Sequence, residues 1–248
     1  MNTFNPPIYI YAVGNYLAPA HEDHLLPLKQ LVLDKTGVNL RRVSRFIQLS
    51  LIGAAECVQG LRNQQGALPS NAAVYLSSEN GDMETVVEVL EAMYCEGQPP
   101  KPLSFINTVS NAACFYIGKT FNLLGESSFI SAIGLAFEQA LSTAIVDLYL
   151  QRIPAALIGS VDVCALPLSN HRTRIDASND VVLGEGSHWL ILASAFGNAK
   201  PLAELLEVRH VATLFDLQDS FVGLLMLGQH LSAADKVTAE PLSHCRQG

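Results

Sequence analysis

Residues 127–141, SSFISAIGLAFEQAL, have the pattern of a strand, a turn and a helix. A turn of this kind, called the elbow below, can present a nucleophile at the start of the helix. Here the turn is AIGL, residues 132–135, and it holds no serine, cysteine, lysine or carboxylate. Glu138 in the following helix could act as a base, but a single acid on a helix is usually solvated or paired. The sequence therefore predicts the geometry for covalent catalysis without a nucleophile.

Two short motifs could bind a metal ion or a phosphate, but both lack the required spacing. HEDH, residues 21–24, has its histidines at i,i+3, whereas the zinc motif HExxH has them at i,i+4. GEGS, residues 184–187, lacks the wider frame of a phosphate-binding loop and is typical of a tight entry to a strand. His171 and His188 have no serine or cysteine partner in a turn. We therefore expect no metal site, no cofactor and no Ser-His-Asp set.

The cysteines are scattered and odd in number: Cys57, Cys95, Cys114, Cys164 and Cys245. No two of them form a CxxC pair, which disfavours a zinc site or a disulfide framework and indicates reduced thiols. Cys114 and Cys164 lie in apolar segments, where a thiol is usually a small, inert hydrophobic residue. We expect neither thiol to be reactive.

Composition limits the possible partners. The 248 residues carry a formal net charge of −8, which disfavours nucleic-acid binding and the direct docking of acidic partners. Only 15% of the residues are charged and 49% are hydrophobic, which indicates either a large core or a buried partner face. The N-terminus lacks the features of a signal peptide, and no apolar run is long enough for a membrane span, so we expect a cytoplasmic protein.

The hydrophobic pattern predicts alternating strands and helices. Strands are expected at residues 7–14, 72–78, 127–132, 155–163 and 188–194, and helices at 40–61, 82–96, 108–124 and 135–152. This alternation implies crossover connections and an α/β fold with a largely parallel sheet covered by helices on both faces. There is no repeat or linker, so we predict a single domain over 1–248, with residues 234–248 as a loose tail.

Four stretches in order resemble the β-ketoacyl synthases, which are enzymes of the thiolase fold. They are RRVSRFIQLSLIGAAE (41–56), FINTVSNAACFYIGKTFNLLGESSFISAIGLAFEQAL (105–141), ALIGSVDV (156–163) and TRIDASNDVVLGEGSHWLILAS (173–194). The resemblance covers roughly residues 8–194. It implies the N-terminal half of a thiolase-like α/β fold, with a mostly parallel mixed sheet.

On this pattern the family's catalytic cysteine falls at Gly134. The register is set by Gly125 before the strand and by Gln139, Ala140 and Leu141 in the helix. Family members that only decarboxylate carry glutamine at this place, so the chain does not match them either. The family's two catalytic histidines belong to the second half of the fold, and no HGTGT-like motif follows in the remaining about 55 residues. The resemblance thus implies a subunit that lacks the nucleophile and both histidines.

The resemblance also implies what the retained elements do. In ketosynthases the strand before the elbow pairs antiparallel with its copy across the dimer axis, and the neighbouring segment, here 104–115, lines the partner's acyl tunnel. The residues assigned in this way are Ser128, Phe129, Ile130 and Ser131 at the dimer interface and Ser104, Phe105, Thr108 and Phe115 at the partner's tunnel. The apolar segment 210–231 is expected to cover part of the helix face that the missing half would bury.

A ketosynthase-like subunit without chemistry resembles the chain-length factors. We therefore expect a heterodimer with an active β-ketoacyl synthase in fatty acid, polyketide or aryl polyene biosynthesis, with acyl carrier protein engaged indirectly through that partner. Two alternatives remain open. One is a stand-alone acyltransferase that uses a thiol such as Cys114 on an acyl thioester, and the other is a homodimeric acyl-binding scaffold.

Overall fold

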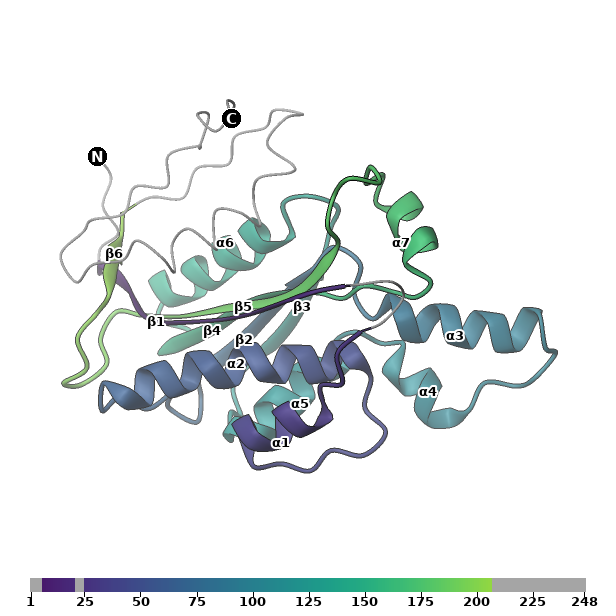
Figure 1. Ribbon diagram of the computed structural model, residues 1–248. Helices are drawn as coiled ribbons and strands as arrows, with labels where there is room; N and C mark the ends of the chain where they lie inside the picture. Colours follow the sequence, from purple (N-terminus) through teal and green to yellow (C-terminus); the bar gives the residue numbers. More distant parts are fainter. Residues whose placement is uncertain (1–5, 21–24, 207–248) are drawn as a thin grey trace.

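The structure is a computed structural model that describes residues 6–20 and 25–206 (Figure 1). The HEDH motif at 21–24, the apolar segment 210–231 and the tail 234–248 lie outside the described residues.

A six-stranded mixed sheet forms the centre of the described part, in the order β3-β2-β4-β5-β1-β6. The strands are β1 (Ile8–Pro19), β2 (Ala73–Ser78), β3 (Ser127–Ser131), β4 (Ala155–Asp162), β5 (Gly184–Ala193) and β6 (Ala203–Leu205). The pairs β3–β2 and β2–β4 are parallel, whereas β4–β5, β5–β1 and β1–β6 are antiparallel. Four strands therefore point one way and two the other. β5 runs antiparallel to β4 because the segment that joins them returns at the same end of the sheet instead of crossing a face.

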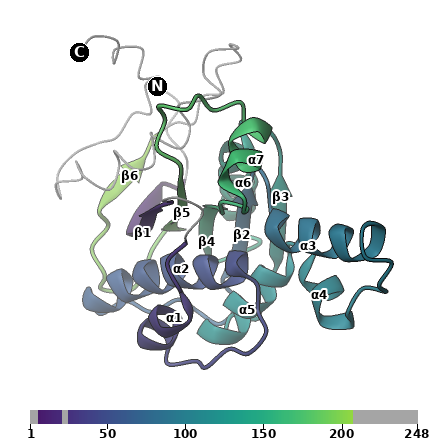
Figure 2. The same cartoon turned by 45° about the vertical axis from the view of Figure 1, so that its right-hand side comes forward.

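Helices cover both faces of this sheet, as predicted (Figures 1 and 2). They are α1 (Lys29–Thr36), α2 (Arg45–Asn63), α3 (Met83–Tyr94), α4 (Pro102–Asn107), α5 (Ala112–Phe121), α6 (Ala136–Tyr149) and α7 (Leu168–Arg174). α1, α2 and α5 lie on one face, α6 lies on the other, and α3 and α4 extend to one side. Each face has its own buried cluster. None of the described helices is long and apolar enough to cross a membrane.

The helix expected over 108–124 is confirmed as α5, which is shorter and covers Ala112–Phe121, whereas the preceding α4 was not predicted. α4 begins at Pro102, a residue that suits the first turn of a helix since its missing N–H has no partner there anyway. α5 ends at Asn122, which adopts the left-handed conformation with φ 56°.

Close packing of α2 on the sheet depends on small residues. A Cβ atom on Gly14 of β1 would lie 2.2 Å from the backbone nitrogen of Cys57 in α2. Gly53 of α2 meets Ser187 of β5 in the same way, at 2.3 Å from its Oγ. These contacts bring the helix backbone directly onto β1 and β5.

Candidate functional site: the elbow and the open strand edge

The elbow has the predicted strand, turn and helix. β3 ends at Ser131, α6 begins at Ala136, and Gly134 in the turn between them has φ 77°. This left-handed region is readily adopted by glycine and rarely by residues with a side chain. Gly134 presents no side chain at the position where the family pattern has its nucleophile. The side chain of the preceding Ile133 is 90% exposed.

A carboxylate lies against the elbow backbone. The Gly134 N–H donates a hydrogen bond to Glu79 Oε1 at 3.1 Å, and Ser131 Oγ donates to the Glu79 carbonyl at 3.5 Å. Glu79 is exposed at the surface, but partial burial of its carboxylate raises its pKa above the ordinary value. The carboxylates of Asp162 and Glu138 raise this pKa further, whereas the Gly134 hydrogen bond lowers it. The ionisable side chain that contacts the elbow backbone is therefore an acid from the neighbouring loop and not a thiol.

Asp162, at the end of β4, holds the loop that carries this acid. Its carboxylate accepts hydrogen bonds from Ser78 Oγ at 2.8 Å and from the backbone N–H groups of Glu79 and Asn80, each at 3.1 Å. The pKa of Asp162 is raised, chiefly by burial, although these donors lower it. Sequence reasoning missed both acids. The available signal was that each follows the carboxyl end of a buried strand, and parallel strands bring those ends together.

β3 forms one edge of the sheet within the described residues. Its pairing with β2 begins where the Val74 N–H donates to the Glu126 carbonyl at 2.9 Å. Alternate residues of a parallel strand face the neighbouring strand, so Ser128 and Ile130 direct their backbone groups toward β2. The backbone N–H and carbonyl groups that face the open edge belong to Ser127, Phe129 and Ser131.

The side chains of β3 tie this edge to the body of the protein. The Phe129 ring packs edge-on against Phe46 of α2, with ring centroids 6.2 Å apart. Ile130 packs on the opposite face against the cluster under α6. The side chains of Ser127 and Ser131 are exposed. Among the described residues, the edge is thus a supported, regular strand whose backbone is unpaired on one side.

The segment proposed to face the partner's tunnel is exposed. Phe105 in α4 is 58% exposed and Phe115 in α5 is 64% exposed, so neither ring is a core residue. Thr108 Oγ1 donates to the Phe105 carbonyl at 2.7 Å and helps to end α4, while Ser104 is half-buried. Phe115 stacks edge-on with Tyr116 at 5.5 Å. Further exposed apolar residues, which sequence reasoning did not single out, lie on α3, on α4 and in the turn after α4: Leu90, Met93, Tyr94, Ile106 and Val109.

The structure makes Cys114 a poor nucleophile. Its side chain is buried, its Sγ lies 3.6 Å from the Ser128 carbonyl, and burial raises its pKa to about 12. Only the thiolate reacts, so a thiol in this state is inert at neutral pH. Burial likewise raises the pKa of Cys164 to about 11, with Glu185 adding to the effect.

The two described histidines are buried and neutral. Burial lowers the pKa of each to about 4, and the charge of Arg174 adds to the shift at His171. The Ala165 N–H donates to His171 Nδ1 at 3.3 Å, which gives this ring a structural contact. His188 lies in the centre of the sheet, between Ser160 of β4 and Asn15 of β1. In the part of the chain that is described, no three His, Cys, Asp or Glu side chains are placed to hold a metal ion.

No protein-family model and no curated protein matches the sequence. Solved structures do match the fold. The ishigamide ketosynthase/chain length factor has a TM-score of 0.61 at 16% identity, over 75% of this chain and 62% of that chain. A β-ketoacyl synthase from Burkholderia phymatum has a TM-score of 0.60 at 12% identity, over 80% of this chain and 62% of that chain. This chain has the fold of the ketosynthases.

A third similar structure is the ketosynthase ApeO in complex with its chain length factor ApeC from Xenorhabdus doucetiae. It has a TM-score of 0.53 at 16% identity, over 77% of this chain and 80% of that chain. These likenesses confirm the predicted thiolase-like α/β fold. The chain spans 62% of the length of the ishigamide structure's chain, so it matches only part of a ketosynthase fold.

Proposed function

We propose that this chain is a catalytically inactive, ketosynthase-like subunit that pairs with an active β-ketoacyl synthase, stabilises it and contributes to the wall of its acyl tunnel. The carrying observation is that the elbow is kept with Gly134 in its turn, directly after a strand whose outer edge is open. An acyl-enzyme needs a nucleophile on that turn. Pairing needs only the strand.

The open edge of β3 supports the pairing. Backbone N–H and carbonyl groups at an unpaired edge readily extend a sheet into another chain, and this interaction needs no particular side chain. The edge is short and is followed by the exposed apolar side chain of Ile133, which would be buried by a second strand and its flanks. Loss of the nucleophile therefore leaves the pairing function intact.

The exposed rings of Phe105 and Phe115 support the contribution to an acyl tunnel. Large apolar side chains gathered on a protein surface mark contacts with other molecules, and an acyl tail is apolar. We propose a role in fatty acid or polyketide biosynthesis, with an aryl polyene pathway as one case. Acyl carrier protein would bind the ketosynthase partner, because the net charge of −8 disfavours acidic partners on this chain.

The two alternative functions, a stand-alone acyltransferase and a homodimeric scaffold, require different features of the protein. A stand-alone acyltransferase would need a reactive thiol, and the burial of Cys114 with a pKa of about 12 argues against it. A homodimeric acyl-binding scaffold would use the same open edge of β3 for a second copy of this chain. The two assemblies are separated by measuring which complex forms.

The test is co-expression of the tagged chain with a full-length β-ketoacyl synthase from the same organism, chosen first from the neighbouring genes if one encodes such an enzyme. We expect a one-to-one heterodimer by size exclusion and native mass spectrometry, with condensing activity that depends on the ketosynthase's own cysteine. The isolated chain, incubated with a labelled acyl thioester, should show no covalent adduct by intact mass. A stoichiometric adduct on this chain would overturn the inactive assignment, and a stable homodimer that ignores the ketosynthase would favour the scaffold.

A further inference from the structure

The amide at the elbow already has an anionic partner. The Gly134 N–H, on the turn where the family pattern has its nucleophile, donates to Glu79 Oε1 at 3.1 Å. Oriented backbone N–H groups at such turns are the donors that stabilise the oxyanion formed in acyl transfer, and they act only if they point at the oxygen of the substrate. In this chain that donor is directed at a carboxylate of the protein.

Glu79 is held in this position at three points. Its backbone N–H donates to Asp162, its carbonyl accepts from Ser131 Oγ, and its carboxylate accepts from the elbow amide. Ser78 and Asn80 on either side also donate to Asp162, so the backbone of the loop cannot swing away without breaking several hydrogen bonds. Since β2 and β3 are parallel with Ser78 opposite Ser131, the loop and the elbow leave the sheet side by side.

We infer that Glu79 prevents the elbow from stabilising an anion. Its carboxylate accepts the hydrogen bond of the Gly134 N–H, and its negative charge repels other negative charge at this position. The inference rests on the proposed function only in taking position 134 as the vacant nucleophile site. It adds a second obstacle to catalysis, which restoring a thiol does not remove. A thiolate or an oxyanion formed here would meet a carboxylate within a few ångströms, and like charges disfavour ionisation.

The first test places a thiol on the elbow of the isolated chain. Gly134→Cys is compared with Gly134→Cys/Glu79→Gln by the rate of alkylation with iodoacetamide as a function of pH, with the alkylated site located by peptide mass mapping. Glutamine keeps the size and the acceptor oxygen of Glu79 and removes its charge. We expect the pKa of the introduced thiol to fall by about one unit in the double variant, which makes alkylation near pH 7.5 about tenfold faster.

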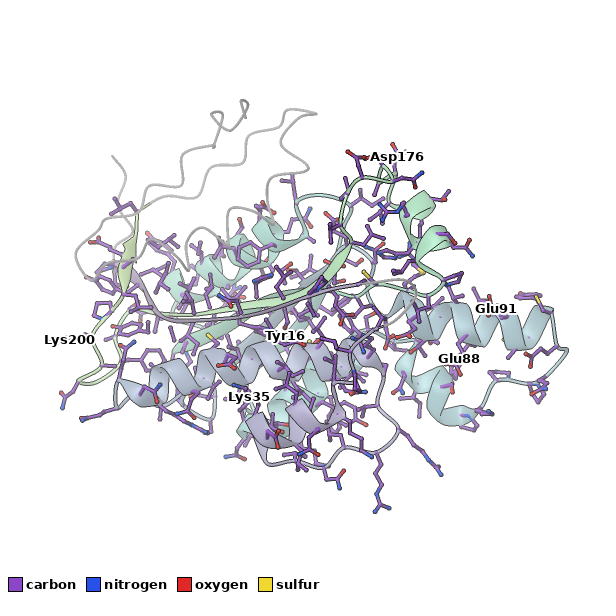
Figure 3. The ribbon with its side chains drawn as sticks, in the orientation of Figure 1. Tyr16, Lys35, Glu88, Glu91, Asp176 and Lys200 are labelled. Atoms are coloured by element: carbon purple, nitrogen blue, oxygen red, sulfur yellow. The ribbon has the colours of Figure 1, made fainter. Side chains whose placement is uncertain are left out.

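The matched control is Gly134→Cys/Glu91→Gln. Glu91 lies in the last turns of α3, is exposed, and has the same charge to lose (Figure 3). Its removal changes the net charge equally without touching the elbow, so the alkylation profile should match that of Gly134→Cys alone. Equal profiles for all three proteins would overturn the inference.

A second measurement needs no thiol, because a cysteine at φ 77° could prevent folding. In the unsubstituted chain, the amide proton of Gly134 is followed by NMR from pH 4 to pH 8. We expect its resonance to move as Glu79 ionises, with a midpoint above the ordinary pKa of glutamate, and to stay constant in Glu79→Gln. An amide proton that does not follow Glu79 would also overturn the inference. Both tests use the chain alone, so their outcome is independent of whether a ketosynthase binds.

Discussion

Arg45 and Glu185 form a buried ion pair that joins the start of α2 to the start of β5. Arg45 Nε donates to Glu185 Oε2 at 2.8 Å, Nη2 contacts Oε1, and Nη1 donates to the Leu26 carbonyl at 2.7 Å. The two side chains are 13% and 1% exposed. The central acid of the GEGS motif is thus a structural partner of the RRVSR segment. Sequence reasoning explained the two glycines of that motif and not the acid between them.

Breaking this pair should be costly. Arg45→Met leaves the Glu185 carboxylate buried without its partner, and we expect a loss of about 3–5 kcal/mol in the free energy of unfolding, measured in urea. The control is Lys35→Met, which removes the exposed pair between Lys35 and Glu56, with side chains 40% and 36% exposed (Figure 3). That loss should stay below about 1 kcal/mol. Similar losses in both variants would mean that the Arg45 pair contributes little.

The close packing around Gly159 on β4 predicts that a larger residue there destabilises the protein. A Cβ atom there would lie 2.4 Å from the ring of Trp189, which is buried and whose Nε1 donates to Ser187 Oγ at 2.9 Å. Gly159→Ala should therefore cost about 1–3 kcal/mol or more of unfolding free energy, because the ring has no room to move. Gly60→Ala in α2, where the nearest atoms lie at 3.6 Å, should be neutral or stabilising by up to about 1 kcal/mol.

The open edge of β3 can be tested with one substitution and its control. Ser127 has an exposed side chain and an N–H that faces away from β2. Ser127→Pro should leave the isolated chain folded, since proline is tolerated at the first residue of an edge strand. It should weaken ketosynthase binding about tenfold by removing one donor, whereas Ser127→Ala binds normally. Unchanged binding by the proline variant would place the interface elsewhere.

Ile130→Pro makes a different prediction from Ser127→Pro. The N–H of Ile130 faces β2, and its side chain packs in the cluster under α6. We expect this variant to be insoluble even without a partner, because proline removes an internal ladder hydrogen bond and the core contact of the side chain. It therefore serves as a folding control and not as a test of the interface.

Phe105 and Phe115 should influence product length in the reconstituted complex. If their rings block the far end of the partner's tunnel, Phe105→Ala or Phe115→Ala opens space and shifts the products to longer chains, measured by mass spectrometry. Both rings are exposed in the isolated chain, so its unfolding free energy should change by less than about 0.5 kcal/mol. Tyr94→Ala, on the 80%-exposed tyrosine of α3, is the control and should leave the distribution unchanged. A uniform fall in yield without a shift in length would contradict the tunnel role.

Thiol labelling of the native chain checks the argument against Cys114. Cys95 is exposed at the end of α3 and should react with iodoacetamide at pH 8. Cys57 and Cys114 are buried with raised pKa values, so they should react only after unfolding in guanidinium. Rapid native labelling of Cys114 would reopen the acyltransferase alternative.

Much of the fold could be read from local patterns. Strands β2, β3 and β4 and helices α2, α3, α5 and α6 were placed within a few residues, because their apolar periodicity, caps and turn residues act locally. The start of α3 is an example, since the Asp82 side chain accepts from the Thr85 N–H as its position before the helix predicts. The short helices α1, α4 and α7 and the strand β6 were missed, because each has too few residues to show a period.

By itself, the sequence determined that the elbow turn carries Gly134 and no nucleophile, and it led us to expect no metal or phosphate site. Only the tertiary structure showed which side chains lie at the elbow. Glu79 and Asp162 are 83 residues apart along the chain and meet at the elbow because β2 and β4 are parallel neighbours. Likewise, only the strand order shows that no other described strand pairs with the outer backbone of β3. The local sequence pattern predicts whether a strand is buried. It does not predict which strands pair with it, because that pairing joins residues far apart along the chain.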